Sequence, residues 1–183
     1  MRWVLSLDTR AVVFLNGLGS PLVDPIFVGA TILGGNLGTL IALVVYALRP
    51  GLRPKLRTLV VGTGLAALAV WLVRLGVQRP RPCNVLALRR VVEPILSANS
   101  FPSGHAAFAG LLVTCALMER WRFRGLWIGF ALVSALSRLY LGQHYPSDVL
   151  VGFALGAIAA LLARLLVRLW RAPAPTSAPR LST

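Results

Sequence analysis

Long apolar runs separated by short polar segments set the pattern of this chain. The first run, from Pro25 to Leu48, holds 24 residues without a charged side chain. A helix of about 20 apolar residues is long enough to cross the hydrocarbon core of a bilayer. Four more runs follow, from Thr58 to Val77, Ser103 to Met118, Gly125 to Gly142 and Asp148 to Trp170. The pattern therefore predicts five transmembrane helices.

The two ends of the chain follow other patterns. Residues 1–20 mix apolar side chains with Arg2, Asp8, Arg10 and Asn16, which is typical of a helix that lies in the membrane interface. Residues 172–183 are rich in Pro, Ala, Ser and Thr, and we expect them to be disordered. The predicted fold is an all-α polytopic membrane bundle: an interfacial N-terminal helix plus five transmembrane helices in one domain, residues 1–171.

Composition agrees with a membrane protein. Of 183 residues, 57% are hydrophobic and 13% charged, with 19 basic and five acidic side chains and a net charge of +14. Soluble domains carry about 25% charged residues, so a soluble protein is disfavoured, and two cysteines exclude a disulfide scaffold. The basic excess could serve nucleic acid, anionic lipid, membrane topology or phosphate binding. No segment resembles a nucleic-acid-binding module, so we expect no nucleic-acid partner.

The distribution of basic residues predicts an orientation. Five helices place the chain termini on opposite sides, with eight basic residues on the N-terminal side and eleven on the other. Three of the eight are assigned to chemistry below, which leaves five against eleven. Because cytoplasmic loops carry the excess of Lys and Arg, the C-terminus is expected in the cytoplasm. The long loop from Gln78 to Pro102 would then face outward.

Two histidines stand at predicted helix starts on that outward side. His105 opens the third predicted span, and His144 precedes the fifth. Asp148 follows His144 by four residues, a spacing that places both side chains on one face of a helical turn. A carboxylate beside an imidazole fixes its tautomer and makes its other nitrogen more basic. The arrangement suits a histidine nucleophile.

Arginines lie at the same predicted level. Arg74, Arg81 and Arg138 flank the outward ends of the second and fourth spans. An ionised side chain at membrane depth is costly and indicates function, and guanidinium donors match the geometry of phosphate oxygens. Ser103 and Gly104 open a helix, where free backbone N–H groups favour an anion. The convergence predicts a phosphate site that holds a nucleophile and an acid.

Three segments carry a family resemblance. They are Arg74-x6-Arg81-Pro82, then Pro102-Ser103-Gly104-His105, then Ser137-Arg138-x5-His144-x3-Asp148. Their order and spacing resemble the signature of the PAP2 superfamily, the type 2 phosphatidic acid phosphatases of membranes. One position departs from the family pattern, because Arg74 stands where a lysine is usual. That substitution keeps the charge and changes the donor geometry.

The resemblance implies a mechanism without metal or cofactor. His144 would attack phosphorus and form a phosphohistidine, Asp148 would orient His144, and His105 would protonate the leaving oxygen and then activate water. The groups implied to hold the phosphoryl oxygens are Arg74, Arg81, Ser103, the N–H of Gly104, and Arg138. The basic cluster would replace a metal ion, and no carboxylate cluster suited to Mg²⁺ is visible in the sequence. Arg79 is open to two interpretations, a fourth phosphate contact or a lipid-facing charge.

The resemblance also implies a substrate class. It indicates a bacterial plasma-membrane lipid phosphatase that acts at the extracytoplasmic face, with undecaprenyl diphosphate as the expected substrate. Phosphatidic acid, phosphatidylglycerol phosphate and lipid A phosphates remain alternatives, as does transfer of the phosphoryl group to another lipid. A non-catalytic lipid binder or transporter is disfavoured by the intact set of His144, His105 and Asp148. Five spans disfavour the related soluble proteins that bind vanadate.

Overall fold

A computed structural model describes residues 2–89 and 99–171 of the chain, and the named elements in these ranges are all helices. They are α1 (Arg2–Gly17), α2 (Asp24–Gly34), α3 (Asn36–Leu48), α4 (Arg53–Gly76), α5 (Pro82–Val85), α6 (Gly104–Met118), α7 (Arg124–Tyr140) and α8 (Pro146–Arg171). The predicted all-α fold class is confirmed. The tail at 172–183, for which disorder is predicted, lies outside the described residues.

Two of these helices are long and apolar enough to cross a membrane on their own. They are Arg53–Gly76 and Pro146–Trp170, and the α2–α3 pair qualifies as a third span if its two bent halves are counted together. The apolar α6 has 15 residues and α7 has 17, so both are shorter than an average span. The chain is a multi-pass membrane protein, and the count of five spans stays a prediction.

The first predicted span consists of two helices that meet at an angle of 54°. The break falls at Gly35, between the end of α2 at Gly34 and the start of α3. A Cβ atom added at Gly34 would lie 1.6 Å from the hydroxyl of Ser134 in α7. The absence of a side chain therefore lets α2 approach α7 closely. This bend brings the end of α2 to the site described below.

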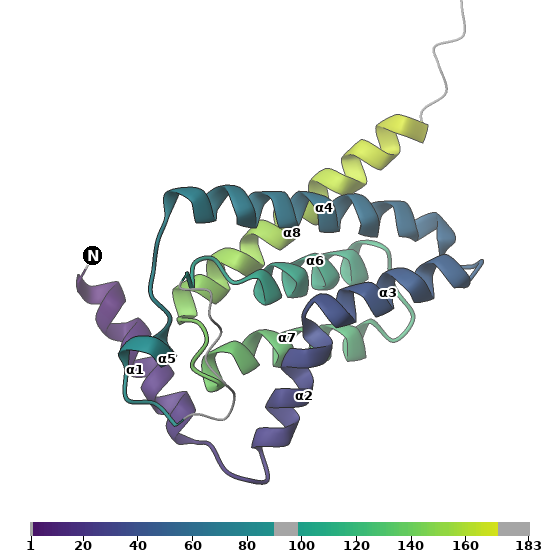
Figure 1. Ribbon diagram of the computed structural model, residues 1–183. Coiled ribbons are helices and arrows are strands. Elements are labelled where there is room, and N and C mark those ends of the chain that lie inside the picture. The colour runs from purple at the N-terminus through teal and green to yellow at the C-terminus, as the bar shows by residue number, and fades with distance from the viewer. Residues whose placement is uncertain (1, 90–98, 172–183) are drawn as a thin grey trace, which may run out of the picture.

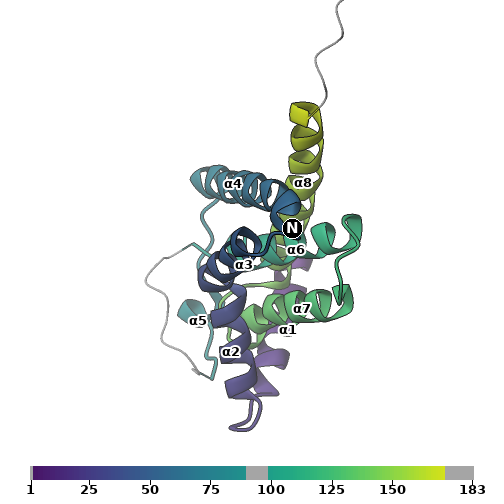
Figure 2. The ribbon, with the colours of Figure 1, turned by 90° about the vertical axis from the view of Figure 1, so that its right-hand side faces the viewer.

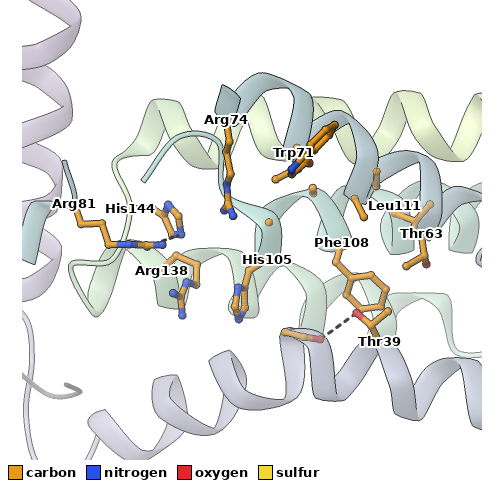
Figure 3. Close-up of a pocket in the computed structure, with 16 residues that line it drawn as sticks. Thr39, Thr63, Trp71, Arg74, Arg81, His105, Phe108, Leu111, Arg138 and His144 are labelled. Carbon is orange, nitrogen blue, oxygen red and sulfur yellow. Dashed lines mark hydrogen bonds between the residues drawn. The ribbon is translucent and has the colours of Figure 1, made fainter. Parts of the chain in front are cut away.

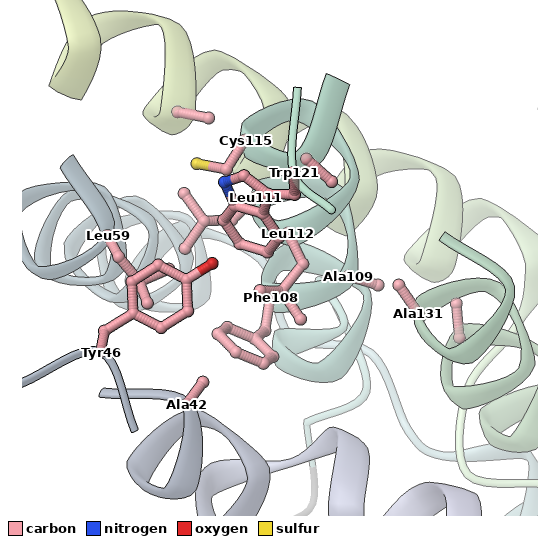
Figure 4. Close-up of a cluster of buried hydrophobic side chains, with 13 residues drawn as sticks. Ala42, Tyr46, Leu59, Phe108, Ala109, Leu111, Leu112, Cys115, Trp121 and Ala131 are labelled. Carbon is pink, nitrogen blue, oxygen red and sulfur yellow. The ribbon is translucent and has the colours of Figure 1, made fainter. Parts of the chain in front are cut away.

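Helix α6 forms the centre of the bundle, between α4 and α7, and α8 crosses it (Figures 1 and 2). A cluster of buried side chains fills the space between α3, α4, α6 and α7 (Figure 4). Phe108 and Leu111 of α6 contribute to it, and the rings of Tyr46 and Trp121 pack within it at 5.3 Å between centroids. Large apolar side chains on α3, α4 and α8 remain exposed, as expected of lipid-facing surfaces.

Small residues let α6 and α8 cross almost in backbone contact. A Cβ atom at Gly156 would lie 1.7 Å from the carbonyl oxygen of Ala107, and one at Gly110 would lie 2.1 Å from that of Phe153. The crossing also joins the first turns of the two helices, where the Ser103 N–H donates to the carbonyl oxygen of Asp148 at 3.1 Å. The residues at both helix starts are therefore held in register.

The N-terminal helix α1 packs against α7 and α8. Its buried face includes Val12 and Asn16. The Asn16 amide donates to the Tyr140 carbonyl at 2.9 Å and accepts from the Arg89 N–H at 2.7 Å. Phe14 on the opposite face is exposed. Helix α1 thus anchors the segment after α5, and its placement in a membrane interface stays a prediction.

Candidate active site

Four helix ends meet at one end of the bundle (Figure 1). Helices α4 and α7 finish there with Arg74 and Arg138 in their last turns. Helices α6 and α8 begin there, with His105 and Asp148 in their first turns. The antiparallel course of the chain therefore gathers residues that lie far apart in sequence, as the predicted spans required.

A cavity of about 500 Å³ opens among these ends. Figure 3 shows Arg74, Arg81, Arg138, His105 and His144 gathered at one end of this cavity. All five are residues that the sequence motifs singled out. The other end of the cavity is lined mainly by apolar side chains from α4 and α6. One space thus joins a strongly basic end to an apolar one.

His144 lies in the turn between α7 and α8. Gly142 adopts a φ of 65°, in the left-handed region that favours glycine. The backbone N–H groups of Gln143 and His144 then both donate to the carbonyl oxygen of Arg138, at 2.9 and 3.1 Å. These bonds fix the His144 backbone against the end of α7, beside a proposed phosphate ligand.

Two contacts define the orientation of the His144 ring. Its Nδ1 lies 2.6 Å from the carbonyl oxygen of Ser100, and its Nε2 lies 3.2 Å from Nη1 of Arg81. A carbonyl oxygen only accepts a hydrogen bond and a guanidinium only donates. The contacts therefore assign the proton to Nδ1 and leave the Nε2 lone pair on the side of Arg81. An Nε2 lone pair is what a histidine nucleophile needs.

Asp148 supports His144 from behind and is fully buried. Its Oδ2 lies 3.7 Å from Nδ1 of His144 and accepts the N–H of Tyr145 at 2.9 Å. Its Oδ1 accepts from Nη1 of Arg79 at 2.6 Å. The predicted proximity of Asp148 to His144 is present, but Nδ1 donates its hydrogen bond to the Ser100 carbonyl, which no sequence motif indicated.

The electrostatic surroundings keep the His144 ring neutral. Burial is the largest cause that lowers the pKa of His144, to about 4. The Asp148 carboxylate acts in the opposite direction, and the positive charges of Arg138 and Arg81 lower the pKa further. A buried imidazole among cations is disfavoured in its protonated form. The lone pair on Nε2 is therefore available at neutral pH.

His105 reaches the same cavity from the first turn of α6. Its Nε2 lies 3.1 Å from the carbonyl oxygen of Thr31 in α2. The hydroxyl of Thr31 accepts a hydrogen bond from Arg138. A Cβ atom at Gly35 would lie 2.5 Å from the His105 ring. The absence of a side chain at Gly35 therefore leaves room for this ring. Thr31 is thus a residue at the site that the sequence reasoning missed.

The three arginines carry donors that point into a shared space (Figure 3). Arg74 donates to the Pro102 carbonyl at 3.2 Å, and Arg81 donates to the Gln143 carbonyl at 2.9 Å. Within residues 2–89 and 99–171, the buried Nε atoms of Arg74 and Arg138 have no hydrogen-bond acceptor. Buried polar groups are nearly always paired in folded proteins. An anion in the cavity would supply acceptors for them.

Ser103 and Gly104 occupy different places at the start of α6. The Ser103 hydroxyl accepts the N–H of Ala106 at 3.4 Å and so caps the helix. Ser103 is fully buried, and Gly104 borders the cavity. Capping uses the Ser103 oxygen only as an acceptor, and Ser103 does not line the cavity. The predicted contacts of the Ser103 hydroxyl and the Gly104 N–H with phosphate stay predictions.

The described residues contain no group of three or more His, Cys, Asp or Glu side chains placed to hold a metal ion. The positive charge in the cavity comes from guanidinium groups, which match phosphate oxygens in geometry. A reaction without metal stays a prediction, and activity in the presence of a chelator tests it.

Comparison with known proteins places the chain in a family. Residues 55–172, more than half of the chain, match the model of the PAP2 superfamily. The chain belongs to the PAP2 superfamily. The matched residues include all three sequence motifs and every side chain that lines the basic end of the cavity. They exclude α1, α2 and α3, although α2 contributes Thr31 to the site.

The curated proteins that the chain resembles include several that are named as phosphatases. The chain is 44% identical over 110 residues to decaprenylphosphoryl-5-phosphoribose phosphatase of Mycobacterium tuberculosis, covering 57% of this chain and 58% of that protein. It is 34% identical over 103 residues to undecaprenyl-diphosphatase BcrC of Bacillus subtilis, covering 55% and 52%. The chain thus matches little more than half the length of these relatives.

Two solved structures share the fold over most of the chain. The crystal structure of Aquifex aeolicus LpxE superposes with a TM-score of 0.76 at 23% identity, covering 87% of this chain and 95% of that one. A transmembrane PAP2-type phosphatidylglycerolphosphate phosphatase from Bacillus subtilis gives 0.75 at 22% identity, covering 95% and 90%. The likeness extends over helices outside the family match, and it concerns the fold alone.

Proposed function

We propose that this protein is a membrane lipid phosphatase that hydrolyses a polyprenyl-linked phosphate, with undecaprenyl diphosphate as its substrate. One observation carries the proposal: three arginines and two histidines line the basic end of a cavity whose other end is apolar. The basic end suits a phosphate group and the apolar end suits a lipid chain. The named relatives act on lipid phosphates by name, which supports the same class.

The first chemical step forms a bond between His144 and phosphorus. The Nε2 lone pair attacks the phosphorus atom, and the bond from phosphorus to the leaving oxygen breaks. His105 acts as the general acid and donates a proton to that oxygen, so that undecaprenyl phosphate leaves from the diphosphate. Arg74, Arg81 and Arg138 stabilise the charge on the equatorial oxygens, where fixed donors provide much of the catalysis.

The second step releases phosphate. Neutral His105 takes a proton from water, and the water oxygen bonds to phosphorus. The P–N bond breaks, its electron pair returns to Nε2 of His144, and inorganic phosphate departs. The intermediate carries a positive imidazole ring, which the Asp148 carboxylate stabilises at 3.7 Å from Nδ1. Both histidines return to their initial protonation states.

The apolar end of the cavity supports a lipid substrate. It is lined on α4 and α6 by Ala66, Val70, Phe108 and Leu111, with Thr63 as a polar member. Figure 3 shows Phe108, Leu111 and Thr63 on the side away from the arginines. Burial of apolar surface stabilises a bound hydrocarbon by roughly 25 cal/mol per Å². A chain that lies here keeps its phosphate at Nε2 of His144.

A second candidate substrate is a polyprenyl-linked sugar phosphate. The relative from Mycobacterium tuberculosis, named as a decaprenylphosphoryl-5-phosphoribose phosphatase, is 44% identical to this chain over 110 residues. That identity is higher than the 34% of the undecaprenyl-diphosphatase from Bacillus subtilis. Both substrates combine a polyprenyl chain with a terminal phosphate, so the cavity suits either.

The proposed orientation places the active site on the extracytoplasmic side. The end of the bundle opposite the site contains the connections from α3 to α4 and from α6 to α7. These connections and the first five residues of the helices after them hold Arg49, Arg53, Lys55, Arg57, Arg120, Arg122 and Arg124. Such a concentration is typical of cytoplasmic loops. The C-terminal end of α8 lies at this same end, in the cytoplasm.

The packing of the N-terminal helices supports a single domain. Helix α1 contacts α7 and α8, and α2 contacts α7, although neither belongs to the family match. We therefore assign residues 1–171 to one domain. Residues 172–183 lie outside the described residues, and their assignment as a disordered tail stays a prediction.

A phosphate-release assay tests the proposed function. The purified protein in detergent is given undecaprenyl diphosphate, a polyprenyl-linked sugar phosphate, phosphatidic acid and phosphatidylglycerol phosphate, each with and without EDTA. The proposal expects the highest kcat/KM on undecaprenyl diphosphate, unchanged by EDTA, and no release by His144→Ala. Release from phosphatidic acid or phosphatidylglycerol phosphate alone would exclude the proposed substrate. Transfer of labelled phosphate to an acceptor lipid, without free phosphate, would identify a transferase.

A further inference from the structure

A buried ion network connects α1 to the proposed nucleophile. Asp8 of α1 is 4% exposed and Asp148 is fully buried. The guanidinium of Arg79 lies between them, with Nη2 at 2.8 Å from Asp8 and Nη1 at 2.6 Å from Asp148. Buried charges are costly unless they are paired and hydrogen-bonded. One arginine therefore compensates two buried carboxylates that are 140 positions apart in the chain.

Asp8 also binds the first turn of α8. Its Oδ1 accepts the Ser147 N–H at 3.0 Å, and its Oδ2 accepts the Ser147 hydroxyl at 2.5 Å. The same hydroxyl accepts from Nη1 of Arg79 at 2.6 Å. An N–H group at the start of a helix has no partner within the helix. Asp8 supplies that partner from another helix and so fixes the turn that carries Asp148.

Arg79 reaches His144 by a second route. Its backbone carbonyl accepts the Ser100 N–H at 2.7 Å, and the Ser100 carbonyl accepts the Nδ1 proton of His144 at 2.6 Å. The guanidinium also stacks on the Tyr145 ring at 3.8 Å. Arg79 thus holds both groups that lie against Nδ1, the Ser100 carbonyl through its backbone and the Asp148 carboxylate through its side chain.

We infer that Asp8 and Arg79 are positioning residues for the nucleophile His144, acting through Asp148 and Ser100. This inference rests on the proposed function. Asp8 balances the charge of Arg79, so that the Asp148 carboxylate retains its attraction for the positive ring of the phosphohistidine. Without that balance, Arg79 would neutralise Asp148 and oppose the intermediate. Asp8 lies outside the residues that match the family, and α1 thereby becomes part of the catalytic apparatus.

The central test compares Asp8→Asn with the wild type. Misplacement of a reacting group by about 1 Å costs about 10²-fold in rate. Asp8→Asn keeps the shape and removes the charge, so we expect kcat to fall between about tenfold and 10²-fold. The inhibition constant of inorganic phosphate should change by less than about twofold, because the arginines of the cavity do not contact Asp8. An unchanged kcat would overturn the inference. So would an inhibition constant of inorganic phosphate that rises by the same factor as kcat falls.

A matched control removes another ion pair that ties the N-terminal part of the chain to the region between α4 and α6. This pair joins Asp24 of α2 to Arg89, which follows α5. Arg89 binds Asp24 at 2.5 Å, and neither residue contacts Arg79, Asp8 or Ser147. Asp24→Asn should change kcat by less than about twofold. A loss of kcat equal to that of Asp8→Asn would mean that general anchoring of the N-terminal region matters, and the inference would fail.

Conservative variants separate charge from mere packing. Arg79→Lys keeps one positive charge but loses the planar guanidinium, whose two Nη atoms bind two different carboxylates. We expect Arg79→Lys to retain at least about tenfold more kcat than Arg79→Met, which leaves both carboxylates uncompensated. Equal kcat for the two variants would contradict the inference. Should Asp8→Asn fail to fold in gel filtration, Ser147→Ala replaces it, and a kcat within about twofold of wild type would overturn the inference.

A readout without turnover keeps this test apart from the proposed function. The chain has only two histidines, so ¹⁵N-histidine NMR of protein without a histidine tag shows two rings, which His105→Ala assigns. Asp8→Asn should shift the ring nitrogens of His144 and leave those of His105 in place. If the wild type releases no phosphate from any lipid, the proposed function fails, and this spectrum alone decides the inference. An unshifted His144 ring would overturn it.

Discussion

Nδ1 of His144 lies 3.7 Å from Oδ2 of Asp148, beyond the distance of a hydrogen bond. The Nδ1 proton points instead to the Ser100 carbonyl, at 2.6 Å. The two supports of the ring are therefore separate. The backbone carbonyl sets the tautomer, and the carboxylate supplies negative charge.

This division predicts the behaviour of Asp148→Asn. When a carboxylate sets the tautomer of a catalytic histidine, its replacement by an amide costs about 10⁴-fold in kcat. Here the Ser100 carbonyl continues to hold the tautomer, so Asp148→Asn should lower kcat by only about 10²-fold. The measurement is steady-state kcat on undecaprenyl diphosphate. A loss as large as that of His144→Ala would show that Asp148 does more than supply charge.

The replacement of the usual lysine by Arg74 leads to a second prediction. Arg74 donates to the Pro102 carbonyl and keeps its Nε free of an acceptor within the described residues. Arg74→Lys preserves the charge, so kcat/KM should stay within about tenfold of wild type, whereas Arg74→Met should lose about 10²-fold. Initial rates at limiting substrate provide the measurement. If the lysine and methionine variants are equally impaired, the guanidinium geometry of Arg74 matters more for catalysis than its charge.

The pH dependence of kcat/KM is the third prediction. His144 must be neutral to attack, and its pKa is lowered to about 4, chiefly by burial. The protonated fraction therefore stays small until the pH approaches 4 from above. We expect the acid limb of the profile to be centred near that value, with a fall of about tenfold per pH unit below it. A limb centred near the ordinary histidine pKa of about 6.5 would contradict the buried, cation-flanked setting of the ring.

Labelling of single cysteines tests the orientation. Both native cysteines, Cys83 and Cys115, are buried, so background reaction with a membrane-impermeant maleimide should be low. Gln78 is exposed near the site, and Arg122 is exposed at the opposite end. In intact cells or spheroplasts, Gln78→Cys should react and Arg122→Cys should not. The reverse pattern would place the active site on the cytoplasmic side.

The sequence predicted the arginines and histidines that line the basic end of the cavity, because each lies at or beside a helix end and in a motif. Arg74, His105 and Arg138 stand where apolar runs begin or end, and antiparallel helices bring such ends together. The bend at Gly35 was not predicted, because residues 25–48 form one uncharged run. The adjacent Gly34 and Gly35 were the available signal of a close approach there.

Other members of the site gave no sequence signal. Ser100 acts through a backbone carbonyl, which any residue possesses. Thr31 lies in an apolar helix, and its contacts with His105 and Arg138 depend on the bend. Arg79, which the sequence left open as a phosphate contact or a lipid-facing charge, does not line the cavity, and its side chain is largely buried. It binds Asp8 and Asp148, a pairing that depends on where α1 packs.

The most direct test of the account is to locate the phosphoryl group on the enzyme during turnover. The wild type is mixed with undecaprenyl diphosphate labelled in its terminal phosphate and quenched in alkali, which preserves phosphohistidine, within the first turnover. Mass spectrometry of the peptides then identifies the labelled residue. We expect label on His144 and none on His105. Label on another residue, or full turnover with no labelled peptide at any time, would contradict it.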